Sequence, residues 1–192
     1  MNISLPVANP GVPDTRSPFR LLVWVGRFQL RTLGLGVLFG VGWMTAQALM
    51  PTPAQVGFKQ LLQFTKAKRP GAGLARGWQA GVAAIYQKGT AKAPVEAAAT
   101  AYVYATAADA KLAWEHACPA CQHVLVNGIQ MRYVARRVNG AIAFQNYTYC
   151  HNVYTAVVAA GPESATKLGN DVGVISGAIY RRAIHFGMSA CK

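Results

Sequence analysis

The pattern of apolar and polar positions first marks out a long uncharged run near the N-terminus. Residues 33–50 read LGLGVLFGVGWMTAQALM, contain no charged side chain and end before Pro51. A run of this length is about the shortest that crosses the hydrocarbon core of a bilayer. It predicts a single transmembrane helix over 33–50, preceded by a basic N-terminal segment over 1–32. A buried helix of a soluble domain is the alternative.

Two features of this region leave its processing and orientation open. Ala46-Gln47-Ala48 has the A-x-A form of a signal-peptide cleavage site, so a cleaved leader is the alternative to an uncleaved signal-anchor. Either route exports the residues that follow. Basic side chains flank the run on both sides, so the positive-inside rule does not choose an orientation.

The composition of residues 51–93 predicts a basic connector that contains Pro and Gly. Two short helices are expected in it, over about 54–67 and 73–87, with a break at Pro70-Gly71. The second rests on apolar residues spaced four apart: Leu74, Trp78, Val82 and Tyr86.

Residues 94–192 predict an α+β domain. Two Asn-Gly dipeptides, at 127–128 and 139–140, lie between β-rich runs, and each suits a two-residue type I′ hairpin. Thr106 and Asp109 form a capping pattern for a helix that ends near Ala117. A last helix is predicted from the apolar residues Leu168, Val172, Ile175 and Ile179. The expected order is β-α-β-β-β-β-α, an antiparallel meander sheet with both helices packed on one face.

Charge and composition narrow the function classes. Only 13% of residues are charged, yet the net charge is +13, and residues 51–92 hold seven lysines and arginines with no acid. Such a basic segment suits anionic lipid, an anionic envelope polymer or nucleic acid. The chain has six acidic residues, and no pair of them suggests general acid–base chemistry. We therefore expect neither an enzyme nor a cofactor.

The four cysteines are the most specific chemical signal: Cys118, Cys121, Cys150 and Cys191. An even number in an exported domain indicates two disulfides. The expected bridges join the HACPACQH segment to Cys150 and to Cys191, although the sequence alone does not choose among three pairings. A zinc site of Cys118, Cys121, Cys150 and His151 or His123 is one alternative. Thiol–disulfide catalysis is another, but this CxxC follows a helix instead of beginning one.

Aromatic and basic residues also alternate along the predicted meander. The candidate binding set is Arg132, Arg136, Arg137, Tyr147 and Tyr149. Aromatic side chains beside arginines on a sheet suit single-stranded nucleic acid or an anionic glycan. Ordinary cross-strand packing is the alternative interpretation.

Two stretches resemble known families. YVYATAADAKLAWEHAC and YTYCHNVYTAVVAAG make residues 98–185 similar to the extracellular sensor domain of mycobacterial serine/threonine kinases and related actinobacterial lipoproteins. That resemblance implies a sensing module that is not a catalyst. Its family usually carries two disulfides, but the close spacing of Cys118 and Cys121 departs from its pattern. Residues 15–51 resemble the elbow and first transmembrane helix of actinobacterial ABC exporters, although the chain has no phosphate-binding loop.

Together these observations predict a membrane-anchored, extracytoplasmic binding or sensing module without catalytic activity. Its expected partners are the membrane, through residues 33–50, and an anionic envelope polymer or a partner protein. No small-molecule ligand can be named. One alternative is a basic accessory subunit of a membrane machine that handles nucleic acid. A second is a zinc-binding or thiol-redox domain.

Overall fold

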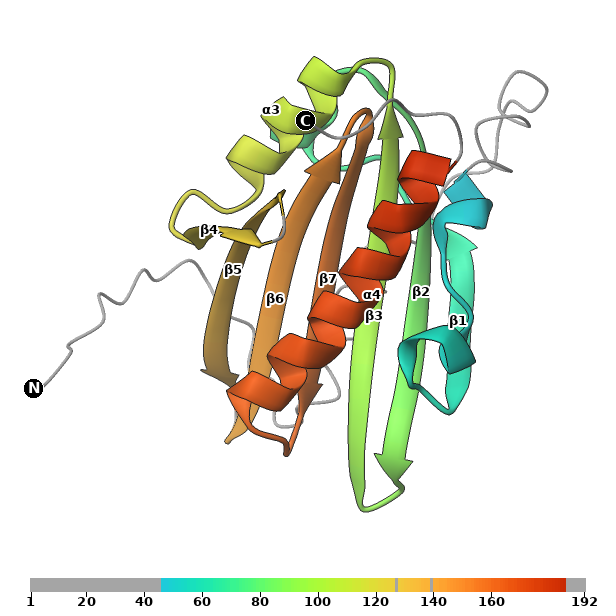
Figure 1. The fold of residues 1–192 in the computed structure, drawn as a ribbon, viewed down its shortest axis with the longest axis vertical. Coiled ribbons are helices and arrows are strands. Elements are labelled where there is room, and N and C mark those ends of the chain that lie inside the picture. The colour runs from blue at the N-terminus through green and yellow to red at the C-terminus, as the bar shows by residue number, and fades with distance from the viewer. Residues whose placement is uncertain (1–45, 127, 139, 186–192) are drawn as a thin grey trace, which may run out of the picture.

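The fold is built on one antiparallel sheet. The computed structural model describes residues 46–126, 128–138 and 140–185. Its seven-stranded sheet has the order β1-β2-β3-β7-β6-β5-β4 (Figure 1). The strands are β1 (Gln60–Lys66), β2 (Trp78–Thr90), β3 (Ala93–Tyr104), β4 (Gln122–Val126), β5 (Ile129–Val138), β6 (Ala141–Cys150) and β7 (Val153–Gly161). The helices are α3 (Ala107–Ala117) and α4 (Ala165–His185), with short 3-10 turns η1 (Pro53–Val56) and η2 (Ala72–Leu74).

The two α-helices pack on opposite faces of this sheet, so the prediction of one shared face is wrong. Successive residues of a strand point to opposite faces. On β7, Val153 and Val157 belong to the main core together with Ile175 of α4, whereas Tyr154 packs with Trp114 of α3. The sheet therefore has an α4 face and an α3 face. Strand β7 is apolar on both sides because a helix reaches each of them.

The predicted connector proves to be part of the sheet. Residues of β1 pair with β2, and β2 pairs with β3 along its whole length. Trp78, Val82 and Tyr86 are spaced four apart, which suits one face of a helix. In β2, Val82 and Tyr86 share the α4 face because their spacing is even, whereas a register shift between Trp78 and Ala80 turns Trp78 to the α3 face. Since Thr90 pairs with Ala93, the predicted boundary at residue 93 falls inside a hairpin. The two predicted helices are replaced by η1, β1 and β2.

The predicted membrane span also needs correction at its C-terminal end. Residues 46–49 are helical, and Ala46 and Leu49 are fully buried in the main core. Pro51 follows at once, and its carbonyl accepts a 2.8 Å hydrogen bond from the Tyr86 hydroxyl. Residues 46–50 thus belong to the domain, and the boundary at Met50 is wrong. The rest of the predicted span lies outside the described residues. Within residues 46–185, the described helices are too short or too polar to cross a membrane.

The meander and both predicted α-helices of the C-terminal half are confirmed. Gly128 and Gly140 have φ near +80°, the left-handed conformation that a type I′ turn requires. At α3, the Thr106 hydroxyl accepts a hydrogen bond from the Asp109 backbone N–H at 3.1 Å. A third two-residue turn joins β6 to β7 at residues 151–152, with His151 at φ 51°.

Candidate functional site

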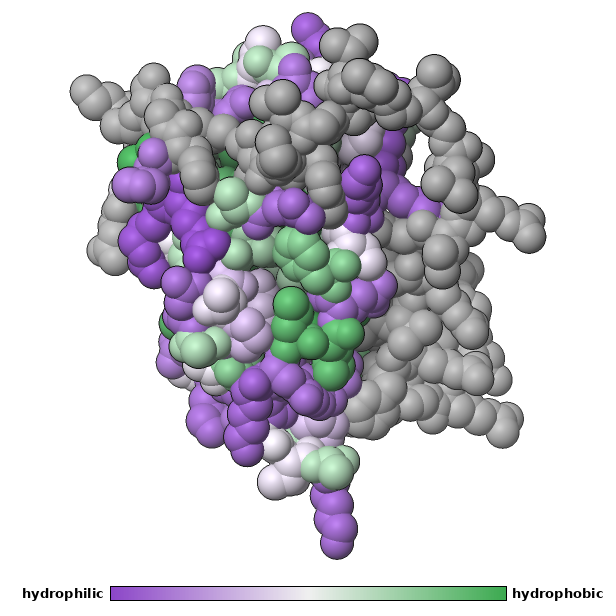
Figure 2. All heavy atoms as spheres, turned by 90° about the vertical axis from the view of Figure 1, so that its right-hand side faces the viewer, coloured by the Kyte–Doolittle hydropathy of each residue, from purple (hydrophilic) through white to green (hydrophobic). Residues whose placement is uncertain are grey.

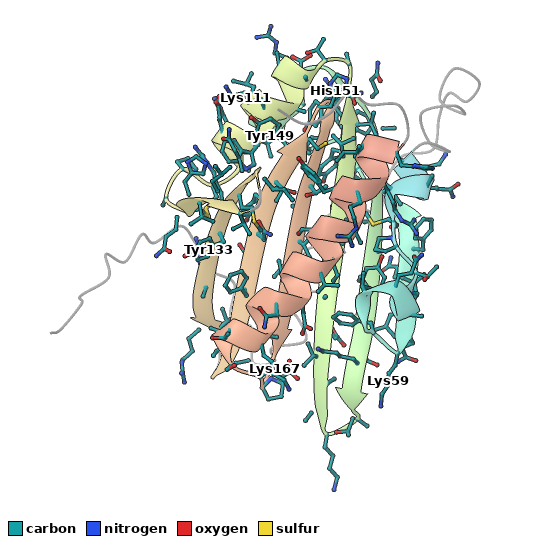
Figure 3. All side chains as sticks on the ribbon, viewed as in Figure 1. Lys59, Lys111, Tyr133, Tyr149, His151 and Lys167 are labelled. Carbon is teal, nitrogen blue, oxygen red and sulfur yellow. A yellow bond between two sulfur atoms is a disulfide. The ribbon has the colours of Figure 1, made fainter. Side chains whose placement is uncertain are left out.

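An aromatic cluster fixes α3 to the sheet. The Trp114 cluster consists of Trp114, His123, Arg132 and Tyr149. The Arg132 guanidinium lies 4.5 Å from the centre of the Trp114 ring, and the Tyr149 ring centre lies 5.0 Å away. The indole N–H donates to the Tyr147 carbonyl at 2.9 Å, and Arg132 donates to the Glu115 carbonyl. Figure 3 places Tyr149 beside α3 at one end of the sheet. Arg132 and Tyr149 therefore hold the helix in place.

A hollow of about 170 Å³ lies further along the α3 face. Its lining residues are Ala98, Thr100, Gln145, Tyr147, Ala156, Val157 and Val158. On the adjacent strands β3 and β7, Ala98 pairs with Val158 and Thr100 pairs with Ala156, and the short side chains of these pairs leave space above the sheet. Tyr147 and Gln145 rise from β6, and the Tyr147 hydroxyl donates to the Gln145 side-chain oxygen at 3.0 Å. The hollow thus combines an apolar floor with hydroxyl and amide groups at one side.

The neighbouring arginines of β5 point to opposite faces. Arg136 pairs with Ala143, on the α3 face, and Arg137 pairs with Ile142, which packs toward α4. Burial raises the pKa of Tyr147, and the charge of Arg136 partly offsets that rise, so Arg136 lies near the hollow. The predicted binding set is therefore divided. Arg136 and Tyr147 lie together, Arg132 and Tyr149 belong to the Trp114 cluster, and Arg137 lies on the other face.

Buried tyrosines line the sheet between the hollow and α3. Tyr102 and Tyr154 stack with ring centres 5.9 Å apart. Burial raises the pKa of both hydroxyls, and that of Tyr154 well above its ordinary value. Sequence reasoning missed Thr100 and Gln145, because small or polar residues at paired positions are recognised only once the strand register is known.

Because the pKa values of these tyrosine hydroxyls are raised, we expect the domain to lose stability at alkaline pH. A tyrosine with a raised pKa stays neutral in the folded state, while the same residue in the unfolded chain ionises near pH 10. The contribution of such a tyrosine to the free energy of unfolding is therefore complete below about pH 10. It is lost as the pH rises toward the folded-state pKa. We expect the free energy of unfolding to fall steadily above about pH 10, as measured by urea denaturation. Tyr154→Phe removes one buried titrating hydroxyl, so its curve should be less steep; an unchanged slope would contradict this explanation.

The structure pairs Cys118 with Cys121, which corrects the expected pairing of this segment with Cys150 and Cys191. The backbone N–H of Cys121 donates to the Cys118 carbonyl at 3.1 Å, and this turn brings the two Cα atoms within 5.3 Å. Cys150 is also disulfide-bonded, and Cys191 lies outside the described residues. The zinc alternative therefore lacks the thiolates that it needs. No group of metal-ligating side chains gathers within the described ranges.

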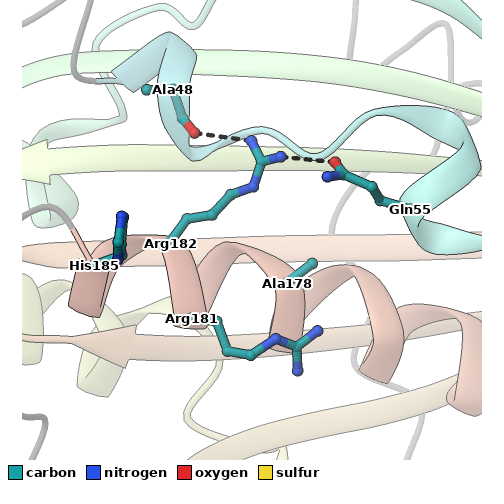
Figure 4. Close-up of a pocket in the computed structure, with 6 residues that line it drawn as sticks. All are labelled: Ala48, Gln55, Ala178, Arg181, Arg182 and His185. Carbon is teal, nitrogen blue, oxygen red and sulfur yellow. Dashed lines mark hydrogen bonds between the residues drawn. The ribbon is translucent and has the colours of Figure 1, made fainter.

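A basic pocket of about 830 Å³ lies between η1 and the C-terminal end of α4 (Figure 4). It is lined by Ala48, Gln55, Ala178, Arg181, Arg182 and His185. The Arg182 guanidinium donates to the Ala48 carbonyl at 2.9 Å, to the Met50 carbonyl and to the Gln55 side-chain oxygen at 2.7 Å. Carbonyls at the end of a short helix need such donors. Arg182 therefore clamps residues 46–50 onto α4.

Comparison with known proteins identifies no family for this chain. No family model matches it, and no curated protein sequence matches it. Among solved structures it is similar to the extracellular domain of PknH from Mycobacterium tuberculosis, with 13% identity and a TM-score of 0.48. The match covers 72% of this chain and 96% of that chain. This is a weak structural resemblance to that extracellular domain. The likeness of residues 15–51 to ABC exporters is not shown.

Proposed function

We propose that this chain is an exported, membrane-tethered module that binds or senses a ligand on the α3 face of its sheet and performs no catalysis. The observation that carries the proposal is the hollow beside Tyr147. Its small floor residues leave room for a ligand group, and Thr100, Gln145 and Tyr147 offer hydroxyl and amide groups to orient it. Arg136 adds a positive charge near the same site. The ligand class that fits is an anionic envelope polymer, or an acidic segment of a partner protein.

Export is supported by the oxidation state of the cysteines. The Cys118–Cys121 bond and the disulfide of Cys150 suit an oxidising compartment, because cytosolic thiols are normally kept reduced. The residues before Ala46 contain the uncharged run 33–45 and are the proposed tether.

A matched pair of arginines tests the binding site. Arg136 and Arg137 are neighbours with the same chemistry and are both exposed, but only Arg136 lies on the α3 face. Using a polyglucuronate glycan as the probe, we expect Arg136→Gln to weaken binding by about tenfold, the loss of one charge-assisted hydrogen bond. Arg137→Gln should change affinity by less than about threefold. Titration calorimetry of the full chain measures both.

Three outcomes would count against this proposal. Equal weakening by the two substitutions would show that binding follows overall charge. Absence of glycan binding would remove the polymer as the ligand class. Tighter binding to DNA than to the glycan, lost when the lysines of residues 59–92 are neutralised, would favour a nucleic-acid accessory subunit.

Location is tested separately in intact cells. Protease added outside should cleave residues 51–185 of the exported chain without lysis. If these residues are digested only after lysis, the export and the tether are both wrong.

A further inference from the structure

The two end strands of the sheet differ in how they are protected from other chains. Exposed sheet edges are usually guarded by charges, proline or bulges. At β1, Lys59 precedes the strand and Lys66 is its last residue, and the register with β2 shifts between Leu61 and Gln63. Figure 2 faces this edge, where apolar atoms lie among polar ones. Strand β4 reads QHVLV, with no lysine, arginine, acid or proline, and its register with β5 is regular.

Strand β4 is nevertheless well exposed. Leu125 is 69% exposed and Val126 is 45% exposed, the former being the most exposed large apolar side chain among the described residues. Within the described part of the chain, β4 pairs with β5 alone. Nothing in its own sequence therefore discourages another strand from pairing with it.

The hairpin register fixes which peptide groups of β4 face outward. Val126 and Ile129 flank a two-residue turn and are cross-strand partners. In such hairpins the flanking pair is hydrogen-bonded, and bonded and non-bonded pairs then alternate along the strands. Val124 and its partner Met131 form the next bonded pair. The N–H and C=O groups of His123 and Leu125 consequently point away from β5.

We propose that two copies of this chain associate by antiparallel pairing of their β4 strands, with a two-fold axis at Val124. His123 of each copy then lies opposite Leu125 of the other, and their outward groups form four backbone hydrogen bonds. A second copy is the partner that fits, since the outward groups are symmetric about Val124 and self-pairing brings no like charges together. The short contact suits a weak dimer that membrane tethering would concentrate. This association is separate from ligand binding on the α3 face.

Cysteine crosslinking tests the register directly. At the axis, Val124 faces its own counterpart with Cα atoms about 4.5 Å apart, a spacing that a disulfide bridges. Val126 is more exposed, but its two copies would lie about 14 Å apart in the dimer. The full chain in membranes, carrying either Val124→Cys or Val126→Cys, is oxidised with copper phenanthroline and run on a non-reducing gel. Wild type gives the background.

We expect Val124→Cys to form at least about ten times more disulfide-linked dimer than Val126→Cys, because only the former is in register. Equal crosslinking at the two positions would indicate random collision and overturn the proposal. Absence of crosslinking by Val124→Cys would overturn it as well.

A proline substitution adds a readout of the backbone bonds. Leu125→Pro removes an outward N–H while leaving the bonds to β5, and proline is tolerated at such edge positions. Leu125→Thr shortens the same side chain but keeps the N–H. In the Val124→Cys background, we expect Leu125→Pro to reduce the dimer by about tenfold and Leu125→Thr by less than about threefold. Equal dimer yields from the two variants would contradict backbone pairing.

Discussion

Leu49→Ala is expected to lower the free energy of unfolding of the domain by about 2–5 kcal/mol, the usual cost of truncating a buried leucine. Leu49 is fully buried in the main core and lies in the segment, residues 46–50, that Arg182 holds against α4. Leu62→Ala makes the same chemical change on β1, where the side chain is 48% exposed, and should cost less than about 1 kcal/mol. Urea denaturation of the full chain, followed by circular dichroism, measures both.

The same comparison distinguishes a domain residue from a membrane residue. If Leu49 lay in the bilayer, its truncation would leave the unfolding of the sheet unchanged, and the two variants would be indistinguishable. The uncharged residues 33–45 that precede the domain remain the proposed tether. Cleavage after Ala48 would also remove the buried Ala46 from the core.

The C-terminal half of the fold was predictable because its signals are local. Asn-Gly turns need positive φ, Thr106 caps α3, and the apolar residues of α4 repeat at helical spacing. The prediction for the N-terminal half was wrong where the local pattern of apolar residues fits both a helix and a strand. Val82 and Tyr86 fit one face of a helix or one face of a strand, and only pairing with β3 decides between them.

The residues of the candidate site could not be predicted without the pairing register of the strands, and the sequence of a single strand does not give that register. Arg136 and Arg137 are indistinguishable by composition, yet one residue of shift sends them to opposite faces. For a similar reason, the sequence did not predict which face of the sheet α3 covers. Tyr154 and Val153 are both apolar enough to be buried, so the sequence of β7 did not show that a helix covers each face. The cysteine pairing followed from a turn at residues 118–121 that spacing alone did not specify.

Trp114→Ala is expected to cost about 3–5 kcal/mol of stability, because it removes the centre of the cluster that joins α3 to β5 and β6. The ring is 3% exposed and contacts Arg132 and Tyr149. Loss of the ring also leaves the Arg132 guanidinium without its aromatic partner. Urea denaturation measures the change, and a cost below about 1 kcal/mol would contradict this role.

A second tryptophan separates the contribution of the ring from that of its hydrogen bond. The Trp114 indole N–H donates to the Tyr147 carbonyl at 2.9 Å, whereas the Trp78 indole N–H is buried without a hydrogen-bond partner. Phenylalanine keeps an aromatic ring but has no N–H. Trp114→Phe should therefore cost about 1–2 kcal/mol more than Trp78→Phe, since only the former breaks a bond, while the latter removes an uncompensated polar group. Equal costs would mean that Trp114 holds α3 through ring packing alone.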